Sequence, residues 1–109
     1  MKIGIIDSFS AAHYIPGHRK CGRLHGHNYK VIVKIPVKYH ANKITVDFHT
    51  LKRHLHNVLE TLDHRDITKL GLYTAEDIAL YIKHEMGKRM NTDVDVIVFE
   101  TDSNFVEVD

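Results

Sequence analysis

The residues from His25 to Ile35 alternate between two kinds of side chain, and this alternation constrains the fold more than any other feature of the chain. Every second position carries a histidine, tyrosine, valine or isoleucine: His25, His27, Tyr29, Val31, Val33 and Ile35. Because side chains along a β-strand point to opposite faces in turn, this pattern predicts a strand with one buried face. Both histidines then continue that buried face.

A second predicted strand runs from Ile3 to His13 and places another histidine in phase with its own apolar residues. If the two strands pair antiparallel through the loop that begins at Pro16, His13 faces His25 and His27. Three neutral imidazoles are a common ligand set for zinc, and three protein ligands leave one coordination position open for water or substrate. The spacing therefore predicts a catalytic zinc (Zn²⁺) site.

Cys21 leaves a second interpretation of the same site open, because it lies only four residues before His25. If its thiol joins His13, His25 and His27, the four ligands form a closed structural zinc site. The chain would then be a non-catalytic zinc-binding module. If the thiol stays free, the metal keeps a position for substrate.

Apolar spacing predicts two helices between two pairs of strands. Leucine and valine recur at helical spacing from Leu51 to Leu62, and a second helix begins at Thr74, whose hydroxyl can cap the first turn with Asp77. Residues 44–48 are short and β-rich, and two apolar strands follow the helices at 94–100 and 105–108. The order ββααββ predicts an α+β fold, with an antiparallel sheet and two helices on one face, in a single domain of residues 1–109. The open sheet edges favour closed assembly with copies of the same chain.

Composition excludes several classes of partner. The formal net charge is only +1, which argues against nucleic acid and against a membrane surface. The start of the chain lacks the apolar core of a secretory signal, and no apolar run approaches the length of a membrane span. A single cysteine cannot form an internal disulfide, so we expect a cytoplasmic protein.

Six short segments, in the order in which they occur, resemble the 6-pyruvoyltetrahydropterin synthase and 6-carboxytetrahydropterin synthase family. They span nearly the whole chain: Phe9–His13, Cys21–Tyr29, Val46–Phe48, Leu62–His64, Thr74–Glu76 and Glu100–Asn104. The resemblance implies a tunnelling fold, in which trimers close into barrels and two trimers stack into a homohexamer. It also implies zinc held by the three predicted histidines and a small pterin as substrate.

The resemblance assigns further roles to residues outside the predicted metal site. It implies that Cys21 acts as the base, and that Asp63 and His64 relay protons together with the cysteine of a neighbouring subunit. Glu100, helped by Thr101, would hold the pterin, since a carboxylate can accept two parallel N–H bonds from an aminopyrimidinone edge. These roles are expectations that depend on the family.

The gap between the cysteine and His25 resembles the carboxy-forming branch, which belongs to queuosine biosynthesis. It implies a zinc-dependent lyase that converts 7,8-dihydroneopterin triphosphate to 6-carboxy-5,6,7,8-tetrahydropterin, with release of acetaldehyde and triphosphate. A 6-pyruvoyltetrahydropterin synthase that eliminates triphosphate is the first alternative, and cleavage of dihydroneopterin is another. The other histidines, His18 among them, lie out of phase with the metal face and are mostly expected at the surface, whereas Glu76 looks like a structural acid in a first helical turn.

Overall fold

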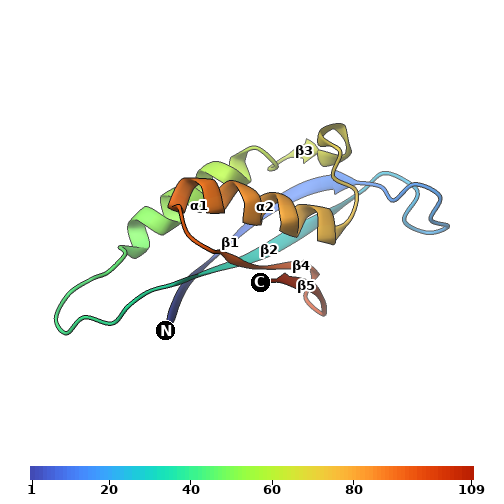
Figure 1. Cartoon of the computed structure of the whole chain (residues 1–109). Coiled ribbons are helices and arrows are strands. Elements are labelled where there is room, and N and C mark those ends of the chain that lie inside the picture. The colour runs from blue at the N-terminus through green and yellow to red at the C-terminus, as the bar shows by residue number, and fades with distance from the viewer.

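The computed structural model describes all 109 residues and builds one sheet with two long helices on one of its faces (Figure 1). In chain order the elements are β1 (Lys2–His13), β2 (His25–Pro36), α1 (Phe48–Glu60), β3 (Arg65–Asp66), the 3₁₀ helix η1 (Ile67–Leu70), α2 (Ala75–Met90), β4 (Asp95–Thr101) and β5 (Asn104–Val108). The strand order across the sheet is β3-β1-β2-β4-β5. The α+β class and the placement of both helices on one face are confirmed.

The two long strands β1 and β2 form the centre of the sheet. They pair antiparallel over their whole length, from Lys2 opposite Pro36 to His13 opposite His25. Strands β4 and β5 extend the sheet antiparallel on the β2 side. On the other side β3 pairs with β1 in parallel, at Ala11 and Ala12 alone. This short strand was not predicted, because two residues carry no periodicity.

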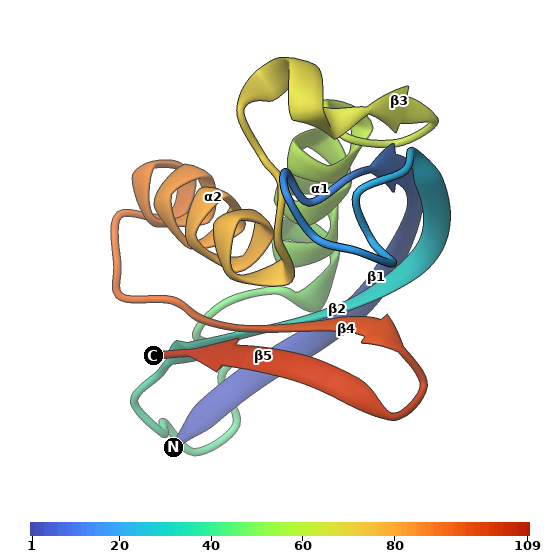
Figure 2. The same cartoon turned by 90° about the vertical axis from the view of Figure 1, so that its right-hand side faces the viewer.

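The hydrophobic core lies between the sheet and the two helices (Figure 2). Leu51 and Leu55 of α1 are fully buried, as are Ile78 and Ile82 of α2. Burying a leucine or isoleucine side chain contributes about 1.5–3 kcal/mol each. These buried side chains therefore help to hold both helices on the sheet. The apolar side chains along one face of each helix therefore form the helical side of the core.

One sequence expectation for local structure is wrong. The β-rich segment at residues 44–48 forms no strand, and Phe48 instead begins α1. Asp47 caps this helix, because its carboxylate accepts a hydrogen bond from the His49 N–H at 2.8 Å. The helix ends at Glu60, so Leu62 is buried from the following turn rather than from the helix.

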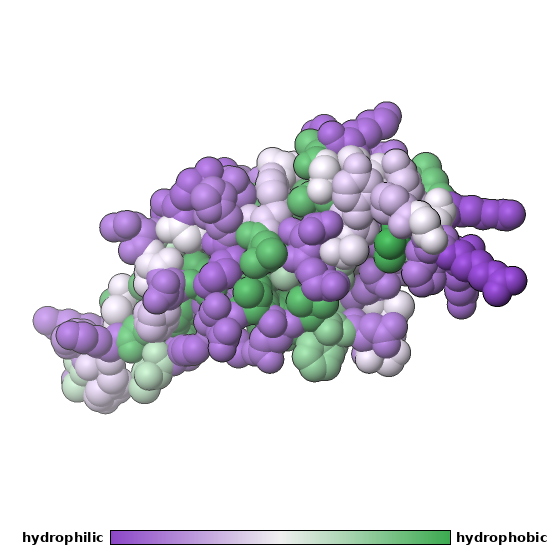
Figure 3. Space-filling view, turned by 45° about the vertical axis from the view of Figure 1, so that its right-hand side comes forward, coloured by the Kyte–Doolittle hydropathy of each residue, from purple (hydrophilic) through white to green (hydrophobic).

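The molecule is elongated, with principal extents of 54 × 23 × 20 Å. Hydrophilic residues cover much of the face seen in Figure 3, with separate hydrophobic patches between them. The loop between β2 and α1 exposes two large apolar side chains, Tyr39 and Ile44. None of the helices has both the length and the apolar character needed to cross a membrane.

Candidate metal centre and its surroundings

The antiparallel register of β1 and β2 brings three imidazoles together at the end of the strands. His13 lies opposite His25, and Ala11, two residues before it on the same face of β1, lies opposite His27. The ring of His13 therefore lies beside both histidines of β2. The ring centroids are 4.5 Å apart for His13 and His25, 5.0 Å for His13 and His27, and 4.9 Å for the third pair. One nitrogen from each ring lies within 4.8 Å of the others, which is the arrangement that a single metal ion requires.

Hydrogen bonds to main-chain carbonyls orient two of the rings. His13 Nδ1 donates to the carbonyl oxygen of Tyr73 at 2.6 Å, and His25 Nδ1 donates to that of Arg23 at 2.7 Å. A carbonyl can only accept, so Nδ1 of each of these two rings carries a proton. In the neutral imidazole the lone pair is then on Nε2. Such bonds are the usual outer-shell support of metal-binding histidines.

The nitrogen atoms that face the centre lack partners within the protein. His13 is fully buried, and its Nε2 and that of His27 are buried without any hydrogen bond. Burial is also the main cause that lowers the pKa of His27, although Glu100 opposes the shift. Imidazole nitrogens without a hydrogen-bond partner that face a common point are what a metal ion needs, so the residues present fit the predicted ion.

Glu100 enters the same centre from β4. Its Oε2 lies 3.9 Å from His13 Nε2, and its Oε1 lies 3.8 Å from His27 Nε2. The carboxylate thus stands beside the metal-binding nitrogens, a position that the sequence alone did not predict. Thr101, the other residue expected at the substrate, is exposed, and its hydroxyl accepts the Ser103 N–H at 3.3 Å in the turn to β5.

Cys21 is half-buried in the loop between β1 and β2. The group of ligand atoms that lie within 4.8 Å of one another contains His13, His25 and His27 but not this thiol. In the single chain the candidate metal centre therefore offers three histidine nitrogens, with the cysteine outside the group. This arrangement favours an open site over the closed site with four protein ligands.

Asp63 and His64 form a hydrogen-bonded pair in the turn after α1. Asp63 Oδ1 accepts the Ser10 N–H at 2.9 Å, and its Oδ2 lies 2.8 Å from His64 Nδ1. The Ser10 N–H, followed by His64, holds the pKa of the Asp63 carboxyl below its usual range. The His64 N–H in turn donates to the Ser10 carbonyl at 2.6 Å, while the backbone of His64 has a positive φ of 58°.

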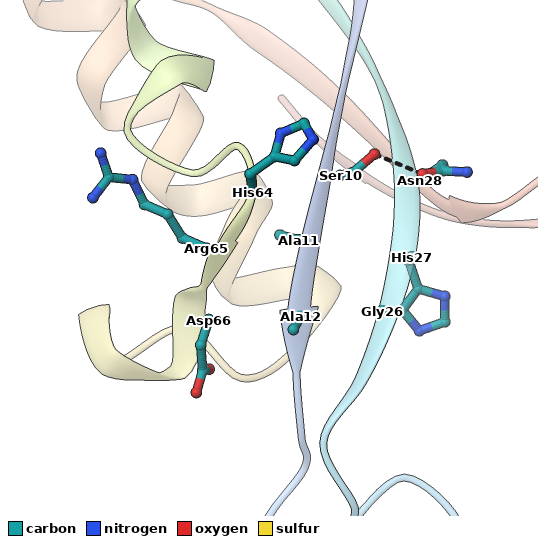
Figure 4. Close-up of a pocket in the computed structure, with 9 residues that line it drawn as sticks. All are labelled: Ser10, Ala11, Ala12, Gly26, His27, Asn28, His64, Arg65 and Asp66. Carbon is teal, nitrogen blue, oxygen red and sulfur yellow. Dashed lines mark hydrogen bonds between the residues drawn. The ribbon is translucent and has the colours of Figure 1, made fainter.

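The His64 ring lies apart from the imidazoles of its own chain. It lines a cavity of about 440 Å³ with Ser10, Arg65 and residues of β2. His27 also lines this cavity, but in Figure 4 its ring lies beside β2, with both strands between it and the ring of His64. The side chain of His64 is 82% exposed, so it is accessible to another molecule.

A second cavity, of about 260 Å³, adjoins the metal centre through Glu100. Thr74 and Glu76 at the start of α2 and Phe105 of β5 also line it. Thr74 and Asp77 form the capping box of this helix, so the Glu76 carboxylate is not needed for the cap. The sequence analysis assigned Glu76 a structural role, and only its position in three dimensions identifies it as a candidate binding residue.

Comparisons with known proteins agree with this geometry. The family model described as 6-pyruvoyl tetrahydropterin synthase matches residues 2–109. A protein of Archaeoglobus fulgidus, provisionally named 6-carboxy-5,6,7,8-tetrahydropterin synthase, is 41% identical over 99% of this chain and 95% of its own length. A Pyrococcus furiosus protein named dihydroneopterin monophosphate aldolase is 34% identical over 86% of this chain and 83% of its own. The solved structure of Caenorhabditis elegans 6-pyruvoyl tetrahydropterin synthase superposes with a TM-score of 0.88 at 27% identity, covering 99% of this chain and 94% of that one.

Proposed function

The chain belongs to the 6-pyruvoyl tetrahydropterin synthase family, and from this premise we propose that it is a zinc-dependent 6-carboxytetrahydropterin synthase. The reaction converts 7,8-dihydroneopterin triphosphate to 6-carboxy-5,6,7,8-tetrahydropterin, with release of acetaldehyde and triphosphate, and serves queuosine biosynthesis. One observation carries the proposal: the imidazoles of His13, His25 and His27 converge on one point, two of them with buried nitrogens that lack a hydrogen bond, while the only cysteine stays outside their group.

His13, His25 and His27 would hold the zinc ion through their unpaired nitrogens. When bound, zinc supplies Lewis-acid polarisation of the substrate's side-chain oxygens. The protein's own part is to orient the imidazoles, through the strand register and through the carbonyls of Tyr73 and Arg23, which hold the rings of His13 and His25. This support leaves the rings little freedom to turn away from a common point.

Proton transfer is assigned to residues outside the metal ligands. Cys21, as the thiolate, removes a proton from a carbon of the substrate side chain. Asp63 orients His64 through the 2.8 Å contact and stabilises the charged imidazole, so that His64 can pass a proton on. The exposure of His64 supports the hypothesis that it meets the Cys21 of a neighbouring subunit.

Two carboxylates are available for the pterin in the cavity next to the metal centre. Glu100 with Thr101 was expected to bind the ring. The carboxylate of Glu100 lies 3.8–3.9 Å from the Nε2 atoms of His13 and His27, which supports a role at the reacting end of the substrate. Glu76 lines the same cavity and can accept the paired N–H bonds of the ring edge. If Glu76 holds the ring, Glu76→Gln raises KM with little change in kcat, whereas Glu100→Gln lowers kcat.

We also propose that the protein is a cytoplasmic homohexamer built from two trimers. In the single chain β1 pairs with β3 at two residues alone, and β5 ends the sheet, so both edges have free main-chain groups. A free cysteine base also requires a reducing compartment. Native mass spectrometry of the zinc-loaded protein tests this, and a stable monomer would contradict it.

The decisive experiment is product analysis. The zinc-loaded protein is incubated with 7,8-dihydroneopterin triphosphate, and the products are identified by mass spectrometry. A carboxypterin with acetaldehyde supports the proposal, whereas 6-pyruvoyltetrahydropterin supports the first alternative. The relative named as an aldolase favours testing dihydroneopterin and its monophosphate as well. A protein that binds zinc tightly and turns over none of these substrates is better explained as a binding module.

A further inference from the structure

The loop that carries Cys21 is organised around the side chain of His18. His18 Nδ1 accepts hydrogen bonds from the main-chain N–H of Cys21 at 2.9 Å and from that of Lys20 at 3.2 Å. Two main-chain bonds close the same loop: the Ile15 N–H donates to the Cys21 carbonyl at 2.7 Å, and the His18 N–H donates to the Ile15 carbonyl at 3.1 Å. The peptide groups on both sides of the Cys21 Cα are therefore held.

The packing of Gly22 is independent evidence that the loop is wound tightly at this point. A Cβ added to Gly22 would lie only 2.3 Å from the main-chain oxygen of His18. No side chain fits at such a distance, so the residue after Cys21 has to be a glycine for the loop to close on His18. The loop thus holds the cysteine from the residue before it and from the residue after it.

The bonds to His18 follow a pattern that short polar side chains usually make. Asparagine and aspartate accept main-chain N–H groups two and three residues ahead and so stabilise turns. Here an imidazole takes that role, and because Nδ1 accepts both bonds it carries no proton. His18 is exposed and does not belong to the group of metal-binding histidines. Its ring therefore has a place in the structure that neither the metal nor the core requires.

We infer that His18 is a positioning residue for Cys21: its Nδ1 fixes the main chain of the cysteine so that the thiol can reach the reacting carbon. The inference deepens the proposed function and depends on it for the role of Cys21. A catalytic group misplaced by about 1 Å can lower the rate about a hundredfold, so a side chain that only fixes a loop can still control turnover.

Three variants test the inference: His18→Leu removes the acceptor, His18→Asn keeps an acceptor oxygen, and His84→Leu is a control on the exposed face of α2. We expect the Cys21 amide to exchange its hydrogen at least about tenfold faster in His18→Leu than in the native protein, because its bond is lost. In the same variant kcat should fall roughly tenfold to a hundredfold while KM changes little. His18→Asn should restore both values to within about threefold, since the amide oxygen accepts the same N–H groups.

Zinc content and thermal unfolding of each variant show whether the fold and the metal centre survive, and both should match those of the native protein. Gly22→Ala provides a second disruption of the same loop and should also speed exchange at Cys21. Native exchange in His18→Leu would overturn the inference, as would faster exchange with unchanged kcat, or a loss in His18→Asn as large as that in His18→Leu. If the native protein turns over none of the pterin substrates, the proposed function fails, and the exchange rates still decide whether His18 fixes the cysteine.

Discussion

The three imidazoles and the Asp63–His64 pair both depend on the second half of β1, but the single chain completes only the first. His13, His25 and His27 take their positions from the register of two long strands, and their rings converge without help from another molecule. His64 is held by its aspartate and by one main-chain bond, and its side chain is mostly exposed.

This difference indicates how the two functions are built. A metal centre has to be rigid, because its ligands must keep their distances, and an antiparallel ladder provides that rigidity. If His64 transfers protons in the site of a neighbouring subunit, it has to reach the surface, and its position on a turn outside the sheet suits that role. The comparison predicts that metal binding is a property of one chain, whereas turnover is a property of the assembly.

The largest effect is expected from His13→Ala, because His13 is the fully buried ligand. Zinc affinity should fall by more than the roughly 10–100-fold that loss of an outer-shell partner costs, and turnover should vanish with the metal. Zinc content by plasma mass spectrometry and a competition titration with a chelator measure the loss. His56→Ala, at an exposed histidine of α1, is the matched control and should keep native affinity. Full zinc retention in His13→Ala would mean that the ion binds elsewhere.

Cys21→Ala separates catalysis from metal binding. We expect kcat to fall by roughly 10²–10⁴-fold, the usual contribution of a general base, with zinc content unchanged. The same two measurements, turnover and bound zinc per chain, distinguish the open site from the closed one. A variant that loses its zinc would show that the thiol is a ligand and would favour the non-catalytic module.

Much of the fold and the metal site could be predicted from periodicity. The two-residue repeat of β2 identified the buried face on which both histidines lie, and a histidine in phase on β1 completed the set. The capping box at Thr74 and Asp77 was equally visible, since it depends on neighbours in sequence. The period of each strand and the neighbours in sequence determine these features, and only the antiparallel pairing of β1 with β2 had to be assumed.

Other features of the fold and the site follow only from the folded conformation of the chain. Glu76 lies in the first turn of α2, as predicted, but it shares a cavity with Glu100 only because α2 packs beside β4 and β5. His18 is exposed, as predicted, and its role as a hydrogen-bond acceptor follows only from the loop conformation. Residues 44–48 have β propensity, but Asp47 caps α1 and no strand lies beside the segment to pair with it.

The proposed role of the Asp63–His64 pair in a neighbouring subunit can be tested by mixing two variants that each have low activity. His64→Ala should lower kcat by about a hundredfold, at the lower end for a proton-transfer group, and leave bound zinc unchanged. If each site combines Cys21 of one subunit with His64 of another, hexamers assembled from Cys21→Ala and His64→Ala chains contain some intact sites. Activity regained after co-refolding, measured against each variant refolded alone, supports shared sites. No recovery in verified mixed hexamers would place both residues in one chain's site.

The smallest effect concerns the link between a helix cap and the metal centre. Asp77 Oδ2 accepts the N–H groups of Tyr73 at 2.9 Å and Thr74 at 3.1 Å, and the Tyr73 carbonyl accepts the proton of His13 Nδ1. Asp77→Ala should therefore destabilise the protein by about 1 kcal/mol through the lost cap. It should also weaken zinc binding by less than about tenfold, because the outer-shell carbonyl is loosened but still present. Chemical unfolding and the chelator titration measure the two effects, and Asp93→Ala, an exposed residue just beyond α2, is the control. A loss of stability without any change in zinc affinity would show that the strands alone orient His13.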